Sequence, residues 1–257
     1  MKIRVVVPIC HATFNDEALR EFSQYASPGT EISIANIAQG PHSIESEYEE
    51  AMSVPGILAL AQEAERDGCD AVISDCFGDP GARAGRELLD IPVIGPAEAA
   101  FLLAAGLGQR FSIVTVLKSV VPMIEHLVQA AGVDSKLASV RTIDIPVLGL
   151  TDIEAMKTGL YREMVAAIEE DDAHVLVLGC TGMMGVAEEL QTQLHEAGFE
   201  VPVVSPTAAK SEVDAADCFS LKGSLIVPPP RLCHAARAAR GITIKPCNLR
   251  VNRNFRA

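Results

Sequence analysis

Short runs of β-branched apolar residues alternate along the chain with longer segments whose apolar residues recur at helical spacing. We expect strands at Ile3–Ile9, Glu31–Ile37, Ala71–Ser74, Pro92–Ile94, Phe111–Val116, Val140–Ile145, His174–Leu178 and Val201–Val204. We expect helices at Asp16–Tyr25, Val54–Asp67, Ala97–Ala105, Val121–Ala131, Ile153–Glu170 and Ala187–Ala197. Strands that alternate with helices in this way are typical of an α/β fold with parallel sheets.

The two halves of the chain contain an internal repeat. The segment from Asp70 to Gly78 aligns with the segment from His174 to Gly182, so that Cys76 matches Cys180. Further on, the residues from Ile91 to Pro96 align with those from Val201 to Pro206, at nearly the same separation. The repeat predicts two similar lobes facing each other across a cleft, with one cysteine contributed by each.

From these patterns we assign three parts to the chain. Residues 1–98 together with 205–227 form the predicted first lobe, residues 99–204 the second lobe, and residues 228–257 a basic C-terminal tail. The apolar runs have the length of strands, well short of the ~20 residues that span a bilayer. The chain starts directly with a strand-like run, so we also expect no secretory signal, no membrane association and a cytoplasmic location.

Charge is distributed unevenly along the chain. From Cys218 onward there are eight lysines and arginines and no acid, whereas the rest carries 13 bases against 34 acids. A basic tail suggests a nucleic-acid arm. This tail has little aromatic interleaving, however, and the acidic body would repel phosphate. We therefore expect no nucleic-acid partner and interpret the tail as docking on the acidic body or on a neighbouring subunit, with a mobile terminus as the simpler alternative.

The seven cysteines are scattered and contain no Cys-x-x-Cys pair, which argues against a disulfide framework and a zinc site. Most are expected to be inert core residues, namely Cys10, Cys69, Cys218, Cys233 and Cys247. Cys76 and Cys180 differ because each follows a predicted strand and precedes a small-residue turn. Ligands bind at the carboxyl ends of parallel strands, and the amides of such turns hold anions and lower the pKa of a thiol.

Two thiols that face each other suit the inversion of a carbon centre. One group removes the α-proton, and the other delivers a proton to the opposite face. Backbone amides of the turns stabilise the charge that develops on the neighbouring carbonyl. No lysine occurs in a comparable motif, so no pyridoxal cofactor is implied, and we expect neither a cofactor nor a metal. The sequence thus predicts a racemase acting on a small carbon acid.

The motifs resemble those of the Asp/Glu/hydantoin racemase superfamily, specifically its hydantoin and allantoin racemase branch. The likeness spans roughly residues 1 to 227. The segments that carry it are Gly40–Ser46, Asp75–Gly81, Val93–Ala100, Arg110–Thr115, Gly179–Met183 and Pro206–Ala209.

The resemblance implies two flavodoxin-like lobes related by a pseudo-twofold, a cyclic ureide substrate such as a 5-substituted hydantoin or allantoin, and a homo-oligomer. It also implies that Cys76 and Cys180 each act on one enantiomer. The implied substrate contacts are the amides of Phe77, Gly78, Thr181 and Gly182 and the side chain of Thr115. The segment Pro41–Ser46, with Ser43, would shape the pocket; the alternative is that it forms a tight turn leading to a capped helix.

One departure from the branch leaves alternatives open. The first strand of these racemases usually ends in an Asn-Pro-Asn-like motif, whereas here it reads Val7-Pro8-Ile9-Cys10-His11, so His11 is a candidate replacement for a lost polar contact. Asp75 would raise the thiol pKa if it pointed into the site, and we expect it to point away. The rival functions are an aspartate or glutamate racemase, a cis–trans isomerase of dicarboxylates, and a non-catalytic small-molecule binding protein. An arylmalonate decarboxylase is disfavoured because both cysteines are present, and a metal site of Cys10, His11, Cys76 and Cys180 lacks a known ligand spacing.

Overall fold

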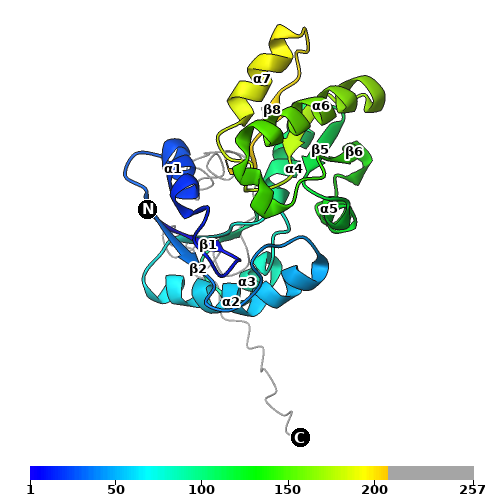
Figure 1. Ribbon diagram of the computed structural model, residues 1–257. Coiled ribbons are helices and arrows are strands. Elements are labelled where there is room, and N and C mark those ends of the chain that lie inside the picture. Colours follow the sequence, from blue (N-terminus) through cyan, green and yellow to red (C-terminus); the bar gives the residue numbers. More distant parts are fainter. Residues whose placement is uncertain (208–257) are drawn as a thin grey trace, which may run out of the picture. The chain divides into compact units, whose positions relative to one another are not determined.

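The computed structural model describes residues 1–207 (Figure 1). The first half of the chain contains β1 (Lys2–Val7), α1 (Asn15–Tyr25), β2 (Glu31–Asn36), α2 (Glu47–Arg66), β3 (Ala71–Ser74), α3 (Ala82–Leu88), β4 (Val93–Ile94) and α4 (Pro96–Leu107). The second half contains β5 (Phe111–Thr115), η1 (Lys118–Val120), α5 (Val121–Ala130), η2 (Asp134–Lys136), β6 (Leu137–Thr142), η3 (Val147–Thr151), α6 (Ile153–Asp171), β7 (Val175–Leu178), α7 (Ala187–Glu196) and β8 (Val203–Val204).

Two parallel four-stranded sheets confirm the predicted α/β fold with two lobes. The first sheet has the strand order β2-β1-β3-β4 and the second the order β6-β5-β7-β8. The two sheets therefore have the same topology: in each, the strand that comes first along the chain lies between the second and the third. In the first lobe, α1 covers one face and α2 and α3 the other; in the second lobe, α6 and α7 lie opposite α4 and α5 (Figure 1).

The internal repeat extends to individual backbone hydrogen bonds. The amide of Asp75 donates to Val6 at 2.8 Å, and that of Gly179 donates to Val114 at 2.7 Å. At the short fourth strands, the carbonyls of Pro92 and Pro202 each accept an amide at 2.9 Å, from Val72 and Leu176 respectively. The two cysteine turns are therefore held by equivalent bonds in the two lobes.

Helix α2 begins seven residues before the predicted start at Val54. Ser46 caps the helix by accepting from the amide of Glu49 at 3.3 Å, and the carboxylate of Glu49 accepts from the amide of Glu45 at 2.7 Å. This capping box satisfies amides that a helix start otherwise leaves unpaired. Pro55 consequently lies inside the helix rather than in its first turn.

Two further elements differ from the expectation. Strand β6 ends at Thr142, because Asp144 adopts a left-handed conformation (φ 56°) that an extended strand does not continue through. Helix α3 was not predicted, because its seven residues show too short an apolar pattern to distinguish a helix from a loop. The lobe boundaries at 98/99 and 204/205 stay a prediction, and the parts of that assignment beyond residue 207, including the basic tail, lie outside the described residues.

Candidate active site

Cys76 and Cys180 lie at equivalent places, each just beyond the carboxyl end of a buried strand. All four residues of β3 and all four of β7 are buried, and each cysteine follows its strand by two residues. Both thiols are partly buried and line one small cavity of about 60 Å³. The structure thus brings together the two cysteines that the sequence singled out.

The turn after each cysteine directs a backbone amide at the sulfur. Gly78 donates to Sγ of Cys76 at 3.5 Å, and Gly182 donates to Sγ of Cys180 at 3.3 Å. Within residues 1–207, the amides of Phe77 and Thr181 have no hydrogen-bond acceptor. Each turn therefore directs one amide at its own thiol. Of the four turn residues expected to contact substrate, Thr181 and Gly182 line the cavity, whereas Phe77 and Gly78 do not.

The side chains that flank the cysteines join the two lobes. Thr181 donates its hydroxyl hydrogen to the backbone oxygen of Asp75 at 3.3 Å, which ties one cysteine turn to the other. The ring of Phe77 packs edge-on against Phe101 of α4 at 5.5 Å between centroids, inside the main core of the second lobe. Cys76 is thereby fixed from both lobes.

The cavity is lined mostly by apolar residues. Its polar lining residues are Asp75, Thr181 and Gly182, beside the two thiols. Its apolar lining residues are Val7, Pro8, Ile9, Phe14, Ile44, Val147 and Met184. The segment Val7–Ile9, where the sequence departs from the family's motif, therefore contributes apolar residues to the cavity lining.

Burial raises the pKa of both thiols, contrary to the expectation of thiolates near neutrality. The pKa of Cys76 lies well above its usual value, because desolvation outweighs the hydrogen bond from Gly78. The pKa of Cys180 rises to about 11 for the same reason, against the hydrogen bond from Gly182. In the unliganded cavity both cysteines are neutral thiols at neutral pH.

Asp75 faces the site, whereas the sequence analysis placed it away. It lines the cavity, and its negative charge is a further cause of the raised pKa of both Cys76 and Cys180. The chain leaves β3 at Ser74, so strand alternation does not determine where the side chain of Asp75 points.

Thr115 and His11 both hold the framework of the site. Thr115 is fully buried and donates its hydroxyl hydrogen to the carbonyl of Gly179 at 2.8 Å, directly behind Cys180. His11 places Nε2 2.6 Å from the carbonyl of His42, and its Nδ1 accepts from the amide of Thr13 at 3.5 Å. Neither residue lines the cavity, and neither does Ser43, although its neighbour Ile44 does.

The other cysteines in the described range divide into two kinds. Cys69 is buried as expected of a core residue. Cys10 is partly exposed, and its sulfur lies 3.8 Å from Nδ1 of His42, so it is not the buried core thiol that was expected. Within residues 1–207, no three histidine, cysteine or acidic side chains converge as metal ligands, and the set of Cys10, His11, Cys76 and Cys180 is not brought together. Cys218, Cys233 and Cys247 lie outside the described residues.

Two glutamates near the thiols were missed by the sequence analysis. Glu45 accepts from the amide of Val147 in η3 at 2.8 Å, a bond that crosses between the lobes at the cavity wall. Glu50 of α2 raises the pKa of Cys76, and Glu45 raises that of Cys180. Their place within and just after the Gly40–Ser46 motif was the available signal, but only tertiary packing turns these carboxyls toward the cysteines.

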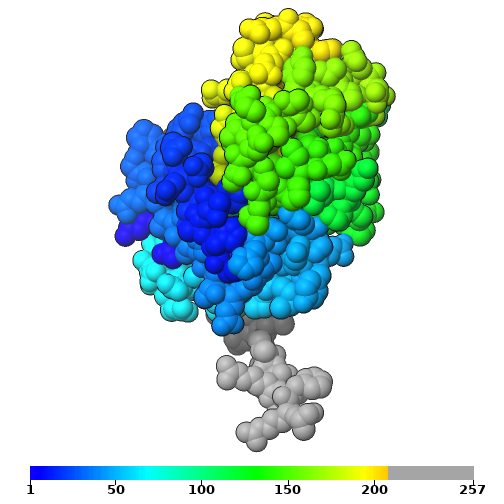
Figure 2. Space-filling model, in the orientation of Figure 1, coloured from blue at the N-terminus to red at the C-terminus, as the bar shows by residue number. Residues whose placement is uncertain are grey.

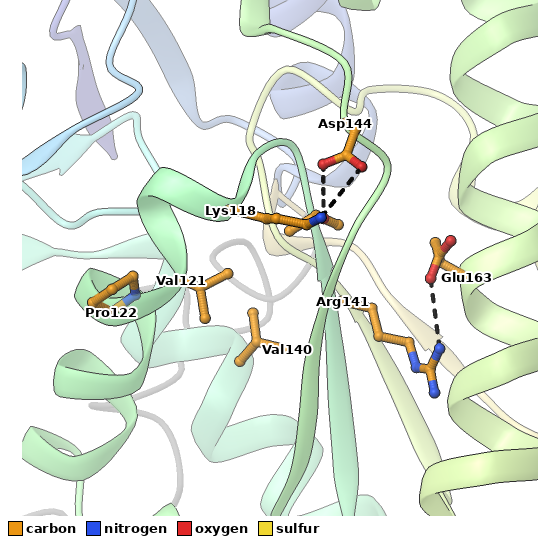
Figure 3. Close-up of a pocket in the computed structure, with 8 residues that line it drawn as sticks. Lys118, Val121, Pro122, Val140, Arg141, Asp144 and Glu163 are labelled. Atoms are coloured by element: carbon orange, nitrogen blue, oxygen red, sulfur yellow. Dashed lines mark hydrogen bonds and ion pairs between the residues drawn. The ribbon is translucent and has the colours of Figure 1, made fainter.

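A larger surface hollow of about 550 Å³ lies along β6 (Figure 3). Its charged side chains are already paired: Lys118 lies 4.0 Å from Asp144, and Arg141 lies within 3.6 Å of Glu163 while also bonding two further acids. The hollow contains no thiol and no unpaired cation for an anionic ligand. Its larger volume therefore does not displace the cysteine cavity as the candidate site.

On the face shown in Figure 2, the surface of the first lobe in blue meets that of the second lobe in green. The Glu45–Val147 and Thr181–Asp75 bonds join the two lobes. No helix in the described part of the chain has the length and apolar character needed to cross a membrane.

The chain is similar in sequence and in fold to known racemases. The family model described as Asp/Glu/Hydantoin racemase matches residues 3–212. A hydantoin racemase of Pseudomonas sp. (strain NS671) is 37% identical over 210 residues, which are 81% of this chain and 82% of the relative. A hydantoin racemase of Rhizobium meliloti is 40% identical over 192 residues, 74% of this chain and 80% of the relative. The solved allantoin racemase from Klebsiella pneumoniae superposes with a TM-score of 0.80 at 33% identity, covering 87% of this chain and 90% of that one.

Proposed function

This chain belongs to the Asp/Glu/hydantoin racemase family, and from that premise we propose that it racemises a 5-substituted cyclic ureide by proton transfer between Cys76 and Cys180. The observation that carries the proposal is the pair of thiols at equivalent strand ends lining one cavity. The reaction class follows from family membership. The roles of the individual residues are our inference from the geometry.

The proposed reaction moves one proton off the substrate and another onto it. The thiolate of one cysteine removes the proton at C5, and the electron pair of the broken C–H bond moves into the adjacent carbonyl. The neutral thiol of the other cysteine then protonates the opposite face of C5. The enantiomer reacts with the two roles exchanged, so each cysteine serves as base for one hand of the substrate.

Backbone amides would stabilise the oxygen that gains charge. The amide of Thr181 lies at the cavity and donates to no acceptor within the described residues, and those of Gly78 and Gly182 already support the sulfurs. Hydrogen-bond donors fixed in a site of low polarity stabilise developing charge strongly. The two thiols and these amides provide every group that the proposed reaction requires, so the proposal includes neither metal nor cofactor.

The raised thiol pKa values fit a two-base mechanism. Only one cysteine needs to lose its proton, and the other must keep it to act as the acid. A thiolate with a raised pKa is scarce at neutral pH, but it is also a stronger base toward a carbon acid. We therefore expect that, once one thiol has lost its proton, the other thiol stays protonated, because a second negative charge in the cavity is disfavoured.

The mostly apolar lining of the cavity favours an apolar substituent at C5. A hydantoin would direct its ring amides and carbonyls toward polar lining residues such as Thr181, and its substituent toward apolar ones such as Phe14 and Ile44. Burying one apolar side chain contributes about 1.5–3 kcal/mol, so we expect kcat/KM for 5-benzylhydantoin to exceed that for allantoin about tenfold or more. Allantoin, with its polar ureido substituent, is the second candidate, supported by the likeness to allantoin racemase.

A substrate panel tests the proposal. Single enantiomers of 5-benzylhydantoin, 5-isobutylhydantoin, allantoin, aspartate and glutamate are followed by polarimetry, each with an enzyme-free blank. We expect loss of optical rotation with the hydantoins, abolished in Cys76→Ser and in Cys180→Ser. The matched control is Cys69→Ala, which removes a buried thiol of the first lobe that does not line the cavity. Racemisation of aspartate or glutamate alone would identify an amino-acid racemase. If no substrate is turned over and both thiols are unreactive, the protein is a binding protein instead.

A further inference from the structure

The carboxyl group of Glu50 lies buried against the turn that follows Cys76. Glu50 belongs to the first turns of α2, and a Cβ atom added to Gly78 would fall 2.5 Å from its Oε2 and 3.3 Å from Cε of Met123. The carboxyl group thus occupies the space that a larger residue at position 78 would fill. Among the described residues, its Oε2 is buried without a hydrogen-bond partner.

The charged groups around this carboxyl group are acidic. On its own helix, Glu47 faces it and also lies 3.8 Å from Nδ1 of His126 on α5. From the cysteine turn, Asp79 faces it, and both carboxylate oxygens of Asp79 accept amides at the start of α4, at 2.8 and 2.9 Å. Burial first, and then these two charges, raise the pKa of Glu50 to about 7.

We propose that Glu50 is a positioning residue that makes the two thiols inequivalent, so that the thiol which ionises first for catalysis is that of Cys180. When Glu50 is ionised, its charge opposes a thiolate on Cys76. The charges that act on Cys180 are those of Asp75 and Glu45, and Glu50 is not among them. This assignment rests on the proposed function only in giving the thiols their acid–base roles.

The inequivalence has a consequence for turnover. Conversion of the enantiomer whose proton faces Cys180 begins directly once Cys180 has ionised, whereas conversion of the other enantiomer also requires a proton to move from Cys76 to Cys180. Two enantiomers have equal free energies, so kcat/KM must remain equal in the two directions at every pH. Steady-state rates therefore conceal the inequivalence, and the reactivity of each thiol reveals it.

The test measures alkylation of each cysteine separately. Wild-type protein and Glu50→Gln are treated with iodoacetamide between pH 6 and 9.5, and the labelled tryptic peptides are quantified by mass spectrometry, with fragment ions separating Cys76 from Cys69. In the wild type we expect Cys180 to react faster than Cys76 above pH 7. In Glu50→Gln we expect Cys76 to react several-fold faster at pH 8.5, because loss of the negative charge lowers the pKa of the Cys76 thiol and increases its thiolate fraction.

The pH dependence distinguishes a charge effect from a structural one. Wild type and variant should converge below about pH 6, where Glu50 is protonated, and Cys180 should change by less than twofold at any pH. Glu63→Gln is the matched control, since it makes the same chemical change at an exposed position of the same helix. An unchanged Cys76 rate in Glu50→Gln, or an equal rise at both cysteines, would overturn the proposal.

A second measurement needs no folded variant. With ¹³C-labelled glutamate in the wild-type protein, NMR should show a side-chain carboxyl that titrates near pH 7. The proposal is overturned if every glutamate carboxyl titrates below about pH 5.5. Neither measurement depends on turnover, so a failure of the racemase assay with the coupling intact would reject the function alone.

Discussion

At the scale of single residues, the positions of the two cysteines follow from local sequence, whereas their protonation states depend on tertiary structure. Cys76 and Cys180 were identified from the sequence because an internal repeat places them after matching strands. Their charge state could not be predicted from the sequence, because it depends on burial and on acidic residues that tertiary structure brings near the thiols. A local turn motif suggested thiolates, and desolvation by residues distant in sequence reverses that expectation.

Glu50 provides a prediction at this scale. Its pKa rises from 4.5 to about 7 on folding, so the folded state retains a proton that the unfolded state loses between these values. Stability therefore falls as pH rises from about 4.5 to 7. In urea unfolding, Glu50→Gln should be about 1–3 kcal/mol more stable than the wild type at pH 8, after discounting for partial exposure, and equal to it near pH 4.5. A stability difference of the same size at both pH values would show that charge is not its cause.

At the scale of elements, strand positions followed from short apolar runs, whereas helix ends depended on caps. The start of α2 at Glu47 is determined by Ser46 and Glu49, whose capping box stands in the sequence but was not used. Apolar periodicity is weak at strand β6 and helix α3. The bounds predicted for β6 were therefore wrong, and α3 was not predicted. Glu45 and Glu50 lie on either side of the cap, and their charges raise the pKa of Cys180 and of Cys76 respectively.

Removal of the cap tests this element. Ser46→Ala should lower the free energy of unfolding by about 1 kcal/mol, because the amide of Glu49 loses its acceptor. Urea denaturation followed by circular dichroism measures the change. Ser43→Ala serves as the control, because within the described residues its side chain makes no hydrogen bond. Equal stability of Ser46→Ala and Ser43→Ala would show that the cap does not hold the start of α2.

At the scale of the whole described molecule, the internal repeat predicted two lobes, but the bonds that join them could not be predicted. Thr181 reaches Asp75, and Glu45 reaches Val147. Each bond connects residues more than 100 positions apart, and no local pattern specifies such pairs. The homo-oligomer expected from the family resemblance stays a prediction.

The Glu45–Val147 bond closes one wall of the cavity, because Ile44 and Val147 both line it. Glu45→Ala leaves the amide of Val147 without its acceptor, which costs about 1–3 kcal/mol where the amide is buried. We expect KM for the substrate to rise about three- to tenfold, with a smaller change in kcat. Glu45→Gln retains an acceptor oxygen and should restore most of the affinity. Equal KM values for Glu45→Ala and the wild type would show that the bond does not shape the site.

The central claim is that two thiols act on opposite faces of one carbon centre. The most direct test is to incubate a single enantiomer of 5-benzylhydantoin in deuterium oxide and to analyse both enantiomers at low conversion. The two-thiol account predicts deuterium at C5 of the product and almost none in the recovered substrate, because the proton taken by one thiol is not the one delivered by the other. Product that retains its original hydrogen, or equal labelling of substrate and product, would contradict it and indicate a single base.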